Sequence, residues 1–224
     1  MDSMAKTTPT ALETLTILGA GQVGTVIAGA AVDAGYTTYI CGSGDAEAIR
    51  HDPVVVESGA VPASAATGIA RSEMVLLAVP WHRHRGIDPE PLAGKILIDV
   101  MNYWAPIDGQ LHSLEEHTIS SSEIVAQHFA AARVVKSLNH LSQYDLDNRQ
   151  LPPGDPGRRG VGVASDDQDA ARQVMLLVDQ IGFDPVFSGP LASGAAFEPG
   201  SEIFAERYTA SQLREALIRA LGQQ

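Results

Sequence analysis

The sequence contains a single cysteine, Cys41, among its 224 residues. An internal disulfide is therefore excluded, and no cysteine-based metal site can form. Because Cys41 lies in an apolar run, we expect it to be a buried small hydrophobic residue and not a reactive thiol. Two histidines, His82 and His84, flank Arg83. With no third ligand evident, we expect a solvated loop or helix start there and no metal site.

Basic residues are also scarce, since 15 Lys and Arg stand against 27 Asp and Glu, a formal net charge of -12. Nucleic-acid binding needs clustered cations, so we expect no such partner. No apolar stretch approaches the ~18 residues that span a bilayer. Residues 1–10 lack the apolar core of a secretory signal and are expected to form a flexible tail. We therefore expect a cytoplasmic protein that does not associate with membranes and acts on a small-molecule substrate.

Apolar β-rich runs alternate with segments of helical periodicity, which predicts parallel strands joined by helices. Helices are expected over residues 22–34 and from the capping-box signature Ser120-x-x-Glu123 to about residue 132. The predicted fold class is α/β, with a Rossmann-type, doubly wound, mostly parallel sheet in a dinucleotide-binding domain over residues 11–142. The expected strands of this domain are 15–18, 37–41, 54–56, 74–79, 96–101 and 133–138.

The sequence pattern changes after Tyr144, where a stretch rich in Pro and Gly follows at residues 151–157. We expect residues 143–224 to form a small C-terminal α/β subdomain packed on the first domain. Its predicted strands are residues 160–164 and 183–187. Ser165 is expected to cap a helix between them, and Thr209-x-x-Gln212 to open a final amphipathic helix. A homodimer or burial within one subunit explains the apolar stripe of that last helix equally well.

The run Gly19-Ala-Gly21-Gln-Val-Gly24 joins the first predicted strand to the first helix. Gly19 permits the turn, Gly21 lets a pyrophosphate approach the backbone, and Gly24 allows the helix to pack on its strand. The main-chain N–H groups of Gln22 and Val23 then point at a phosphate, with the helix dipole adding attraction. We therefore predict that this segment binds a nicotinamide dinucleotide.

The end of the second predicted strand reads Cys41-Gly-Ser43-Gly-Asp45. An acidic residue there would hold the ribose 2′-hydroxyl of NAD, whereas Arg or Ser accommodates the 2′-phosphate of NADP. Ser43 can donate to a phosphate, but Asp45 would repel one if it turned inward. The nearest cation, Arg50, would have to fold back from the following helix. NADP is favoured, and NAD stays open.

Two asparagines, Asn102 and Asn139, follow the fifth and sixth predicted strands, at the edge where such sheets bind ligands. Each is expected either to hydrogen-bond the nicotinamide amide or to close a turn. Lys136, within the sixth strand, is expected to reach solvent or to pair with a carboxylate. Trp81 and Trp104 are packing residues or stacking platforms. No Ser/His/Asp set is evident, so no catalytic side chain is predicted.

These motifs together resemble a known family, the F420-dependent NADP oxidoreductases, from about Leu15 to Leu191. The same domain occurs in related bacterial dinucleotide-binding reductases and in the cytoplasmic part of ferric-reductase membrane proteins. The resemblance is carried by the glycine motif and by Cys41-Gly-Ser43, Leu77-Ala-Val-Pro80-Trp81, Arg133-Val-Val-Lys-Ser-Leu-Asn139-His140 and Phe187-Ser-Gly-Pro-Leu191.

The resemblance implies site residues by position. Ala20, Gly21, Gln22 and Val23 would hold the pyrophosphate, and Ser43 the 2′-phosphate. The cofactor cleft would be walled by Val79, Pro80 and Trp81, and the side that binds the deazaflavin coenzyme F420 would include Asn139 and Leu141. This chain departs from the family at Gly44, where an arginine is usual, at Asn139, where F420 enzymes carry a histidine, and after Leu191, at Phe197-Glu-Pro-Gly200.

The function implied by the resemblance is hydride transfer between NADP(H) and coenzyme F420, in which the cofactors carry the chemistry. One alternative is an NADPH-dependent reductase of a flavin, quinone, imine or carbonyl. Another is a dinucleotide-binding protein without catalysis. F420 requires a pocket wide enough for a tricyclic ring, with cations near its mouth for the acidic tail. In the later part of the chain the one adjacent basic pair is Arg158-Arg159.

Overall fold

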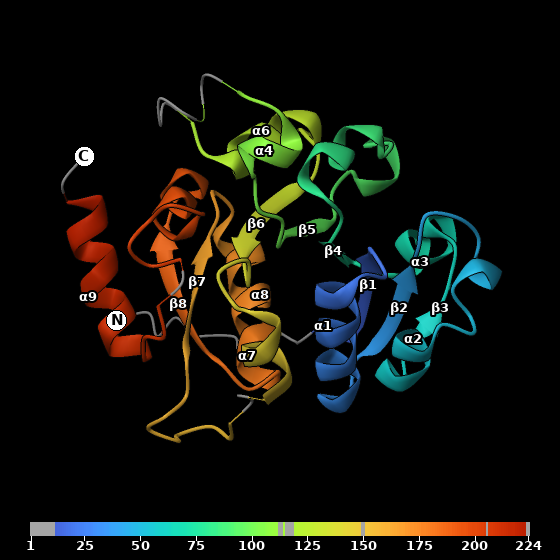
Figure 1. The fold of residues 1–224 in the computed structure, drawn as a ribbon, viewed down its shortest axis with the longest axis horizontal. Helices are drawn as coiled ribbons and strands as arrows, with labels where there is room; N and C mark the ends of the chain where they lie inside the picture. The colour runs from blue at the N-terminus through green and yellow to red at the C-terminus, as the bar shows by residue number, and fades with distance from the viewer. Residues whose placement is uncertain (1–11, 112–113, 115–118, 149–150, 205, 223–224) are drawn as a thin grey trace, which may run out of the picture.

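The computed structural model describes residues 12–111, 114, 119–148, 151–204 and 206–222. Within them, eight strands form one sheet in the order β3-β2-β1-β4-β5-β6-β7-β8. Neighbouring strands are parallel except for β6 and β7. The first six strands follow the order of a doubly wound dinucleotide-binding sheet. The predicted α/β Rossmann-type fold class is therefore confirmed (Figure 1).

The sheet is strongly twisted. In Figure 1 the arrows of β1 and β2 and those of β7 and β8 all point upward, although β7 runs antiparallel to β6. The right-handed twist that accumulates through β4, β5 and β6 accounts for this reversal. The strands are β1 Thr14–Leu18, β2 Thr37–Cys41, β3 Val61–Pro62, β4 Met74–Leu77, β5 Ile96–Asp99, β6 Arg133–Ser137, β7 Gly160–Ala164 and β8 Asp184–Gly189.

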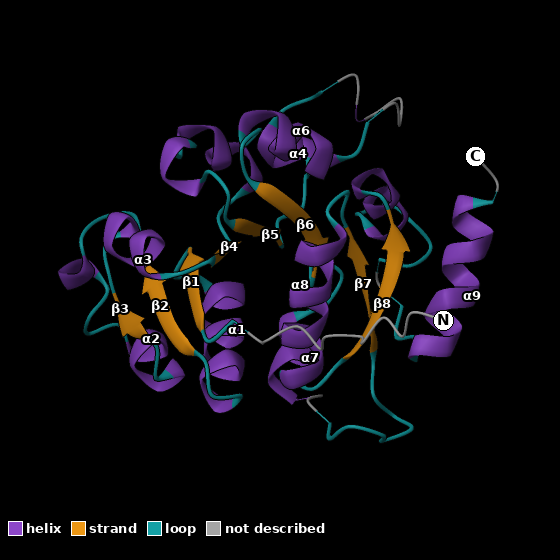
Figure 2. Cartoon of the chain, turned by 180° about the vertical axis from the view of Figure 1, so that it is seen from behind, coloured by secondary structure: helices purple, strands orange, loops and turns teal. Residues whose placement is uncertain are grey.

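Helices cover both faces of the sheet, as Figure 2 shows from behind. The α-helices are α1 Gln22–Asp33, α2 Pro53–Ser58, α3 Ala65–Arg71, α4 Ala105–Asp108, α6 Ser121–His128, α7 Gln143–Asn148, α8 Gln168–Gln180 and α9 Ala210–Leu221. Short 3-10 turns are η1 Ala46–Ala48, η2 Trp81–Gly86, η3 Glu90–Leu92 and η4 Leu191–Phe197. Among the described residues, no helix has the length and apolar character needed to span a membrane.

Two apolar layers result from this arrangement. One buries Ile27 of α1 and Val174 of α8 together with alternate sheet residues such as Ile17. The other buries α3 and α6 residues, among them Phe129 near the end of α6, against the opposite side chains of β4 and β5. Cys41 is 1% exposed, and burial raises the pKa of its thiol to about 11. Its predicted role as a buried hydrophobic residue is confirmed.

The predicted third strand at residues 54–56 is wrong, because this segment is the helix α2. Asp52 accepts a hydrogen bond from the Val54 N–H at 3.1 Å, Pro53 occupies the first turn, and Gly59 ends the helix at φ +69°. These start and stop signals outweigh the strand preference of three consecutive valines. The third strand is instead the two-residue β3.

The predicted cap of α8 is also wrong, since Asp167 and not Ser165 occupies that position. The Asp167 carboxylate accepts hydrogen bonds from the N–H groups of Asp169 and Ala170, each at 2.9 Å. Ser165 donates instead to the Val134 carbonyl at 2.7 Å. The two other predicted caps are confirmed as capping boxes, at Ser120 with Glu123 and at Thr209 with Gln212.

The C-terminal residues extend the main sheet. β7 pairs with β6 through Lys136 opposite Ala164 and Ser137 opposite Val163, and β8 pairs with β7. Helix α9 buries Leu213 and neighbouring residues in a third apolar cluster at this end of the molecule. We expected a six-stranded sheet, and the structure instead shows one sheet of eight strands among the described residues. The division of the chain at residue 142 stays a prediction.

Replacing Asp167 with Ala should destabilise the fold by about 1–2 kcal/mol. The change removes a helix cap, which is worth about 1 kcal/mol, and a charge pair with Arg133, whose Nε lies 2.6 Å from Asp167 Oδ2. Equilibrium unfolding in urea measures the loss. Asp169→Ala, in the same helical turn but without a cap role, is the matched control and should cost less.

This stabilisation should depend on pH. The hydrogen bond from Arg133, together with that from the Ala170 amide, holds the pKa of Asp167 well below its usual value. A carboxyl whose pKa is lowered on folding stabilises the protein fully above its unfolded pKa of about 3.9, and that contribution is lost as the pH falls towards the folded pKa. The difference between the wild type and Asp167→Ala should therefore shrink below about pH 4. A difference that stays constant down to pH 2.5 contradicts this explanation.

Candidate functional site

The glycine turn after β1 is held by close contacts between backbones. Gly19 has φ +125°, and its N–H donates to the Cys41 carbonyl at 2.8 Å. A Cβ at Gly19 would lie 2.3 Å from the Ala78 carbonyl oxygen, and one at Gly24 would lie 2.0 Å from the Gly19 carbonyl oxygen. No side chain fits at either place, so these glycines let β1, α1 and the end of β4 meet.

Gly21 differs from the other two glycines, because a Cβ there would meet nothing within 4 Å. Its backbone is extended at φ -86°, a conformation that any residue adopts. The packing of the protein itself therefore does not require glycine at this position. The glycine leaves open space there, as the prediction of a bound pyrophosphate requires.

The N-terminus of α1 is open to a ligand. Gly21 is its N-cap, no side chain caps it, and its first turn holds no acidic residue. Gln22 and Val23 are exposed, whereas the Thr25 hydroxyl turns back to donate to the Gly21 carbonyl at 3.0 Å. The free N–H groups of this first turn and the positive end of the helix dipole together form an anion-binding position.

At the end of β2 the hydroxyl-bearing residue is accessible. Ser43 is exposed, and the neighbouring Asp45 carboxylate accepts from the Ala48 N–H at 3.3 Å, as the cap of η1. The carboxylate is thus engaged by a helix turn. Arg50 does not fold back towards Ser43 but pairs with Glu47, Nε to Oε2 2.8 Å. The predicted alternative in which Arg50 serves this position is not seen.

The segment after β4 presents Val79 and Pro80 at the surface and turns Trp81 inward. Trp81 is 3% exposed, and its ring packs edge-on against His84 at 4.7 Å and Tyr103 at 5.2 Å between centroids. Of the two roles considered for Trp81, the structure shows packing. Val79 also packs against the apolar cluster that contains Trp81.

The two histidines of η2 lie in different environments. His84 is fully buried, against our expectation of a solvated segment; its Nδ1 donates to the Trp81 carbonyl, and burial lowers its pKa. His82 instead lies 2.7 Å from a carboxylate oxygen of Asp108. In the described part of the chain, no group of three His, Cys, Asp or Glu residues could hold a metal ion.

The two predicted asparagines hold each other across the ends of β5 and β6. Asn102 Nδ2 donates to the Asn139 carbonyl at 2.8 Å, and Asn139 Nδ2 donates to Asn102 Oδ1 at 3.0 Å. Asn139 Nδ2 also donates to the Phe197 carbonyl at 2.9 Å, so both of its N–H groups are used. Asn139 is 4% exposed, whereas Asn102 is half-buried and keeps one N–H free of these bonds.

A buried ion pair between Asp99 and Lys136 supports this asparagine pair, and the sequence did not predict that Asp99 would be the partner. Asp99 and Lys136 are both fully buried, with Nζ 3.3 Å from Oδ2. Asp99 Oδ1 accepts from the Met101 N–H at 2.9 Å, and Lys136 Nζ donates to the Met101 carbonyl at 2.6 Å. Ser122 donates to Asp99 at 2.6 Å. The pair thus fixes the backbone directly before Asn102, and Lys136 makes the carboxylate pair that was one of its two expected roles.

The predicted basic pair is buried and neutralised. Arg158 lies 2.7 Å from Asp179 and 3.0 Å from Asp184, and it is 2% exposed. Arg159 pairs with Asp145 and donates to the His140 carbonyl at 2.8 Å. Neither guanidinium is therefore available to the acidic tail of a second substrate, which was the role considered for them.

His140 and Leu141 lie in the interior beyond β6. His140 Nε2 accepts from the Gly162 N–H at 3.0 Å, and burial, with the charges of Arg159 and Lys136, lowers the pKa of His140 to about 3. This histidine is neutral at any physiological pH. Leu141 is 7% exposed and packs in the same apolar cluster as α1. Its contact with a deazaflavin stays a prediction.

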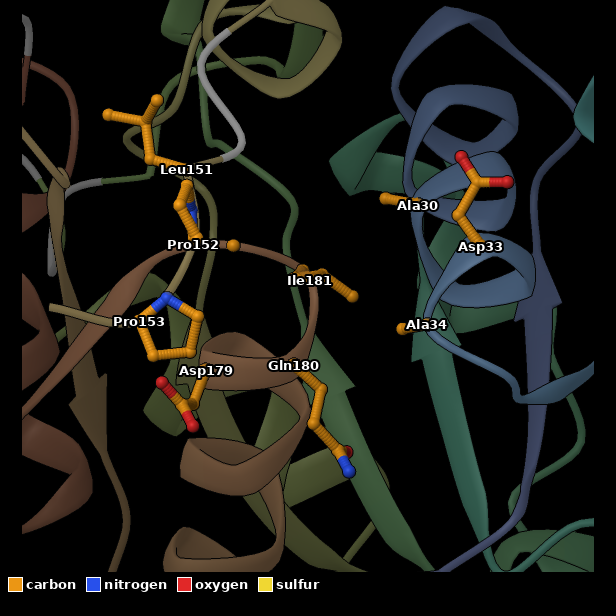
Figure 3. Close-up of a pocket in the computed structure, with 10 residues that line it drawn as sticks. Ala30, Asp33, Ala34, Leu151, Pro152, Pro153, Asp179, Gln180 and Ile181 are labelled. Carbon is orange, nitrogen blue, oxygen red and sulfur yellow. The ribbon is translucent and has the colours of Figure 1, made fainter. Parts of the chain in front are cut away.

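A pocket of about 330 Å³ lies away from the predicted site residues (Figure 3). Ala30, Asp33 and Ala34 line one side, at the end of α1 opposite the glycine turn, and Asp179 and Gln180 line the other. A helix rises about 1.5 Å per residue, so roughly 12 Å separate Ala30 from the start of α1. The pocket contains none of the residues predicted to bind the cofactor.

Comparison with known proteins confirms the resemblance inferred from the sequence. Residues 14–103 match the family described as NADP oxidoreductase, coenzyme F420-dependent. These residues comprise β1 to β5 and the segment that follows, and they include the glycine turn, Ser43, Val79 to Trp81 and Asn102. This match supports NADP-type dinucleotide binding in that part of the chain.

Two solved structures share the fold over most of the chain. The hypothetical protein SMa0349 of Sinorhizobium meliloti is 27% identical, with a TM-score of 0.76 over 88% of this chain and 95% of its own. A protein of Arthrobacter sp. FB24, described as a candidate F420-dependent NADP reductase, is 25% identical, with a TM-score of 0.68 over 95% and 96%.

A longer relative matches in part. The metalloreductase STEAP3 of Rattus norvegicus is 36% identical over 109 residues, which are 49% of this chain and 20% of that protein. The matched half of this chain therefore spans about a fifth of the length of that relative.

Replacing Lys136 with Met should destabilise the protein by roughly 3–5 kcal/mol, because Asp99 would stay buried without its countercharge. Asp99→Asn combined with Lys136→Met removes both charges and should recover part of that loss. Urea unfolding of the two variants and the wild type measures both effects. If the single variant is as stable as the double variant, the ion pair does not have the role described here.

Proposed function

Given that residues 14–103 match the F420-dependent NADP oxidoreductase family, we propose that this protein transfers a hydride between NADP(H) and the deazaflavin coenzyme F420. The observation that carries the proposal is the uncapped N-terminus of α1 beside Gly21, where the protein leaves open the space that a pyrophosphate needs. The nicotinamide and deazaflavin rings supply the redox chemistry when bound, so the protein has to bind, align and shield them.

In this proposal the main-chain N–H groups of Ala20 to Val23 hold the pyrophosphate, and the exposed Ser43 hydroxyl donates to the 2′-phosphate. The Asp45 carboxylate accepts a hydrogen bond from the Ala48 N–H of η1, so it is engaged there and not by the phosphate. These roles use only groups that the structure leaves accessible at the ends of β1 and β2.

Asn102 is the better placed of the two asparagines to donate to the nicotinamide carboxamide, because one of its N–H groups is uncommitted. Both N–H groups of Asn139 already donate hydrogen bonds, one of them to Asn102, and its side chain is buried. In this proposal Asn139 therefore positions Asn102. Val79 and Pro80 form the adjacent wall. Of the two roles that we considered for each asparagine, the proposal thus gives amide binding to Asn102 and turn closure to Asn139.

A second candidate function is NADPH-dependent reduction of another acceptor. Asn139 stands where F420 enzymes of the family carry histidine, and its side chain is committed to Asn102 and Phe197. The partial match to a metalloreductase also favours testing flavin and ferric acceptors. The acceptor assay described below separates the two functions.

Gly21→Asp should weaken NADPH binding at least about tenfold, since it places a carboxylate where the pyrophosphate is expected, and tenfold corresponds to only about 1.4 kcal/mol. The fold should survive, because Gly21 has an ordinary backbone conformation and Asp is a favoured N-cap residue. Isothermal titration calorimetry measures the dissociation constant. The matched control is Gly86→Asp, at another glycine whose Cβ would meet nothing within 4 Å.

Calorimetry on the wild type with NADP and NAD tests cofactor preference in the same series, and we expect NADP to bind more tightly. Equal NADPH affinity for the wild type and the folded Gly21→Asp variant would falsify the assignment of the pyrophosphate position.

Mixing the wild type with NADPH and oxidised F420 should cause the absorbance of both to fall together. FMN, a quinone and a ferric chelate, each tested separately under the same conditions, are the competing acceptors. Turnover with one of these and none with F420 overturns the leading proposal in favour of the second candidate. Cofactor binding without turnover on any acceptor favours a binding protein without catalysis.

A further inference from the structure

An exposed aromatic side chain stands beside the proposed nicotinamide position. Trp104 follows Asn102 by two residues and is 46% exposed, and Ile107, one turn further along, is 70% exposed. Tyr103, between Asn102 and Trp104, packs inward against Trp81. Trp104 is therefore a large apolar surface left open at the end of β5, the edge at which sheets of this type bind ligands.

Asp108 holds the backbone of Trp104 against the η2 turn, which follows β4. The Trp104 N–H donates to Asp108 Oδ2 at 2.8 Å, and the other oxygen of that carboxylate accepts from the His82 N–H at 3.1 Å. The Asp108 side chain is 2% exposed. Burial alone would raise the pKa of Asp108, but the hydrogen bonds from Trp104 and His82 outweigh it and hold that pKa below its usual value. Asp108 thus joins Trp104 to the η2 turn as a carboxylate.

The ring of Trp104 is supported from the C-terminal side. Phe204 packs edge-on against it, with 5.9 Å between ring centroids. The same C-terminal segment binds the neighbouring elements, since the Phe197 carbonyl accepts from Asn139 and Glu198 accepts from the Ser121 N–H at 3.1 Å. An edge-on contact supports the indole while leaving a face free for another ring.

The turn joined to Trp104 carries positive charge. Arg83 and Arg85 of η2 are exposed, and neither forms an ion pair with any residue that the structure describes. Arg158 and Arg159, in contrast, are neutralised by aspartates. In a chain of net charge -12, two exposed arginines on one short turn, without an ion pair in the described part of the chain, attract anions locally.

We propose that Trp104 is the platform on which the ring of the second substrate stacks, and that Arg83 and Arg85 bind the anionic tail of that substrate. This rests on the proposed function and specifies its acceptor as a planar aromatic redox ring with an acidic tail. The segment 197–204, which departs from the family pattern, then belongs to the acceptor side of the site because it holds Trp104 and Asn139.

Trp104→Ala should raise the KM for F420 about tenfold or more and leave the KM for NADPH within twofold, since it removes the aromatic surface on which the acceptor ring stacks. Trp104→Phe retains a ring and should stay within about threefold of the wild type. Phe187→Ala removes another exposed aromatic side chain, on the edge strand β8, and is the matched control with no expected change.

A binding measurement that does not depend on turnover accompanies the kinetics. The chain has two tryptophans, of which Trp81 is buried and Trp104 is exposed. Acrylamide should therefore quench mainly Trp104, and saturating F420 without NADPH should protect it. A deazaflavin lacking the acidic tail should protect it equally once saturating.

The tail is tested by Arg83→Ser combined with Arg85→Ser. This variant should bind F420 about tenfold more weakly and the tail-less deazaflavin unchanged, and the F420 affinity of the wild type should fall with added salt. Arg172→Ser with Arg214→Ser, at exposed positions on α8 and α9, is the charge-matched control.

An unchanged KM for F420 in Trp104→Ala, or unchanged acrylamide quenching at saturating F420, overturns the proposal. If Trp104→Ala does not fold, the quenching measurement on the wild type decides alone. If the wild type binds NADPH but never reduces F420, the proposed function fails, and protection of Trp104 by F420 still decides whether the platform exists.

Discussion

The contact on which the rest of this structure depends is the one between backbones at the glycine turn. The Gly19 carbonyl oxygen lies where a side chain at Gly24 would begin, and the Ala78 carbonyl oxygen lies where one at Gly19 would begin. This close packing brings the ends of β1, β2 and β4 to the N-terminus of α1. The same turn leaves the first N–H groups of α1 without partners, so the feature that closes the fold also makes the anion-binding position.

A second set of interactions carries this geometry across the sheet. Asp99 and Lys136 are buried at a cost in solvation that an apolar pair would avoid. They nevertheless bind both backbone groups of Met101, which determines where Asn102 lies. Asn102 then holds the end of β6 through Asn139. The buried polar groups between β5 and β6 thus support the edge of the candidate site. Burying charged groups costs solvation free energy, which is why such pairs are uncommon in protein cores.

Several expectations from the sequence were wrong for identifiable reasons. Residues 54–56 have high strand propensity, but Asp52, Pro53 and Gly59 supply helix start and stop signals that prevail. His84 has polar neighbours in the sequence but is buried, because its ring packs against His128 and Phe129 at the end of α6 as well as against Trp81. Arg158 and Arg159 are the one adjacent basic pair in the later part of the sequence, yet aspartates of α7, α8 and β8 neutralise them. In each case a partner from outside the local segment, or a cap at its boundary, decided the outcome.

The sequence by itself determined the Rossmann-type fold, the glycine turn with its requirements at Gly19 and Gly24, and two capping boxes. These features act between residues a few positions apart, so the spacing of residue types is sufficient to predict them. Only the tertiary structure decided that Asn102 hydrogen-bonds to Asn139, that Lys136 pairs with Asp99, and that Phe204 packs against Trp104. The partners in these pairs are separated by 37 residues or more along the chain. The twist and order of the strands determine which polar or aromatic residues come into contact. No local sequence pattern encodes a contact between distant segments.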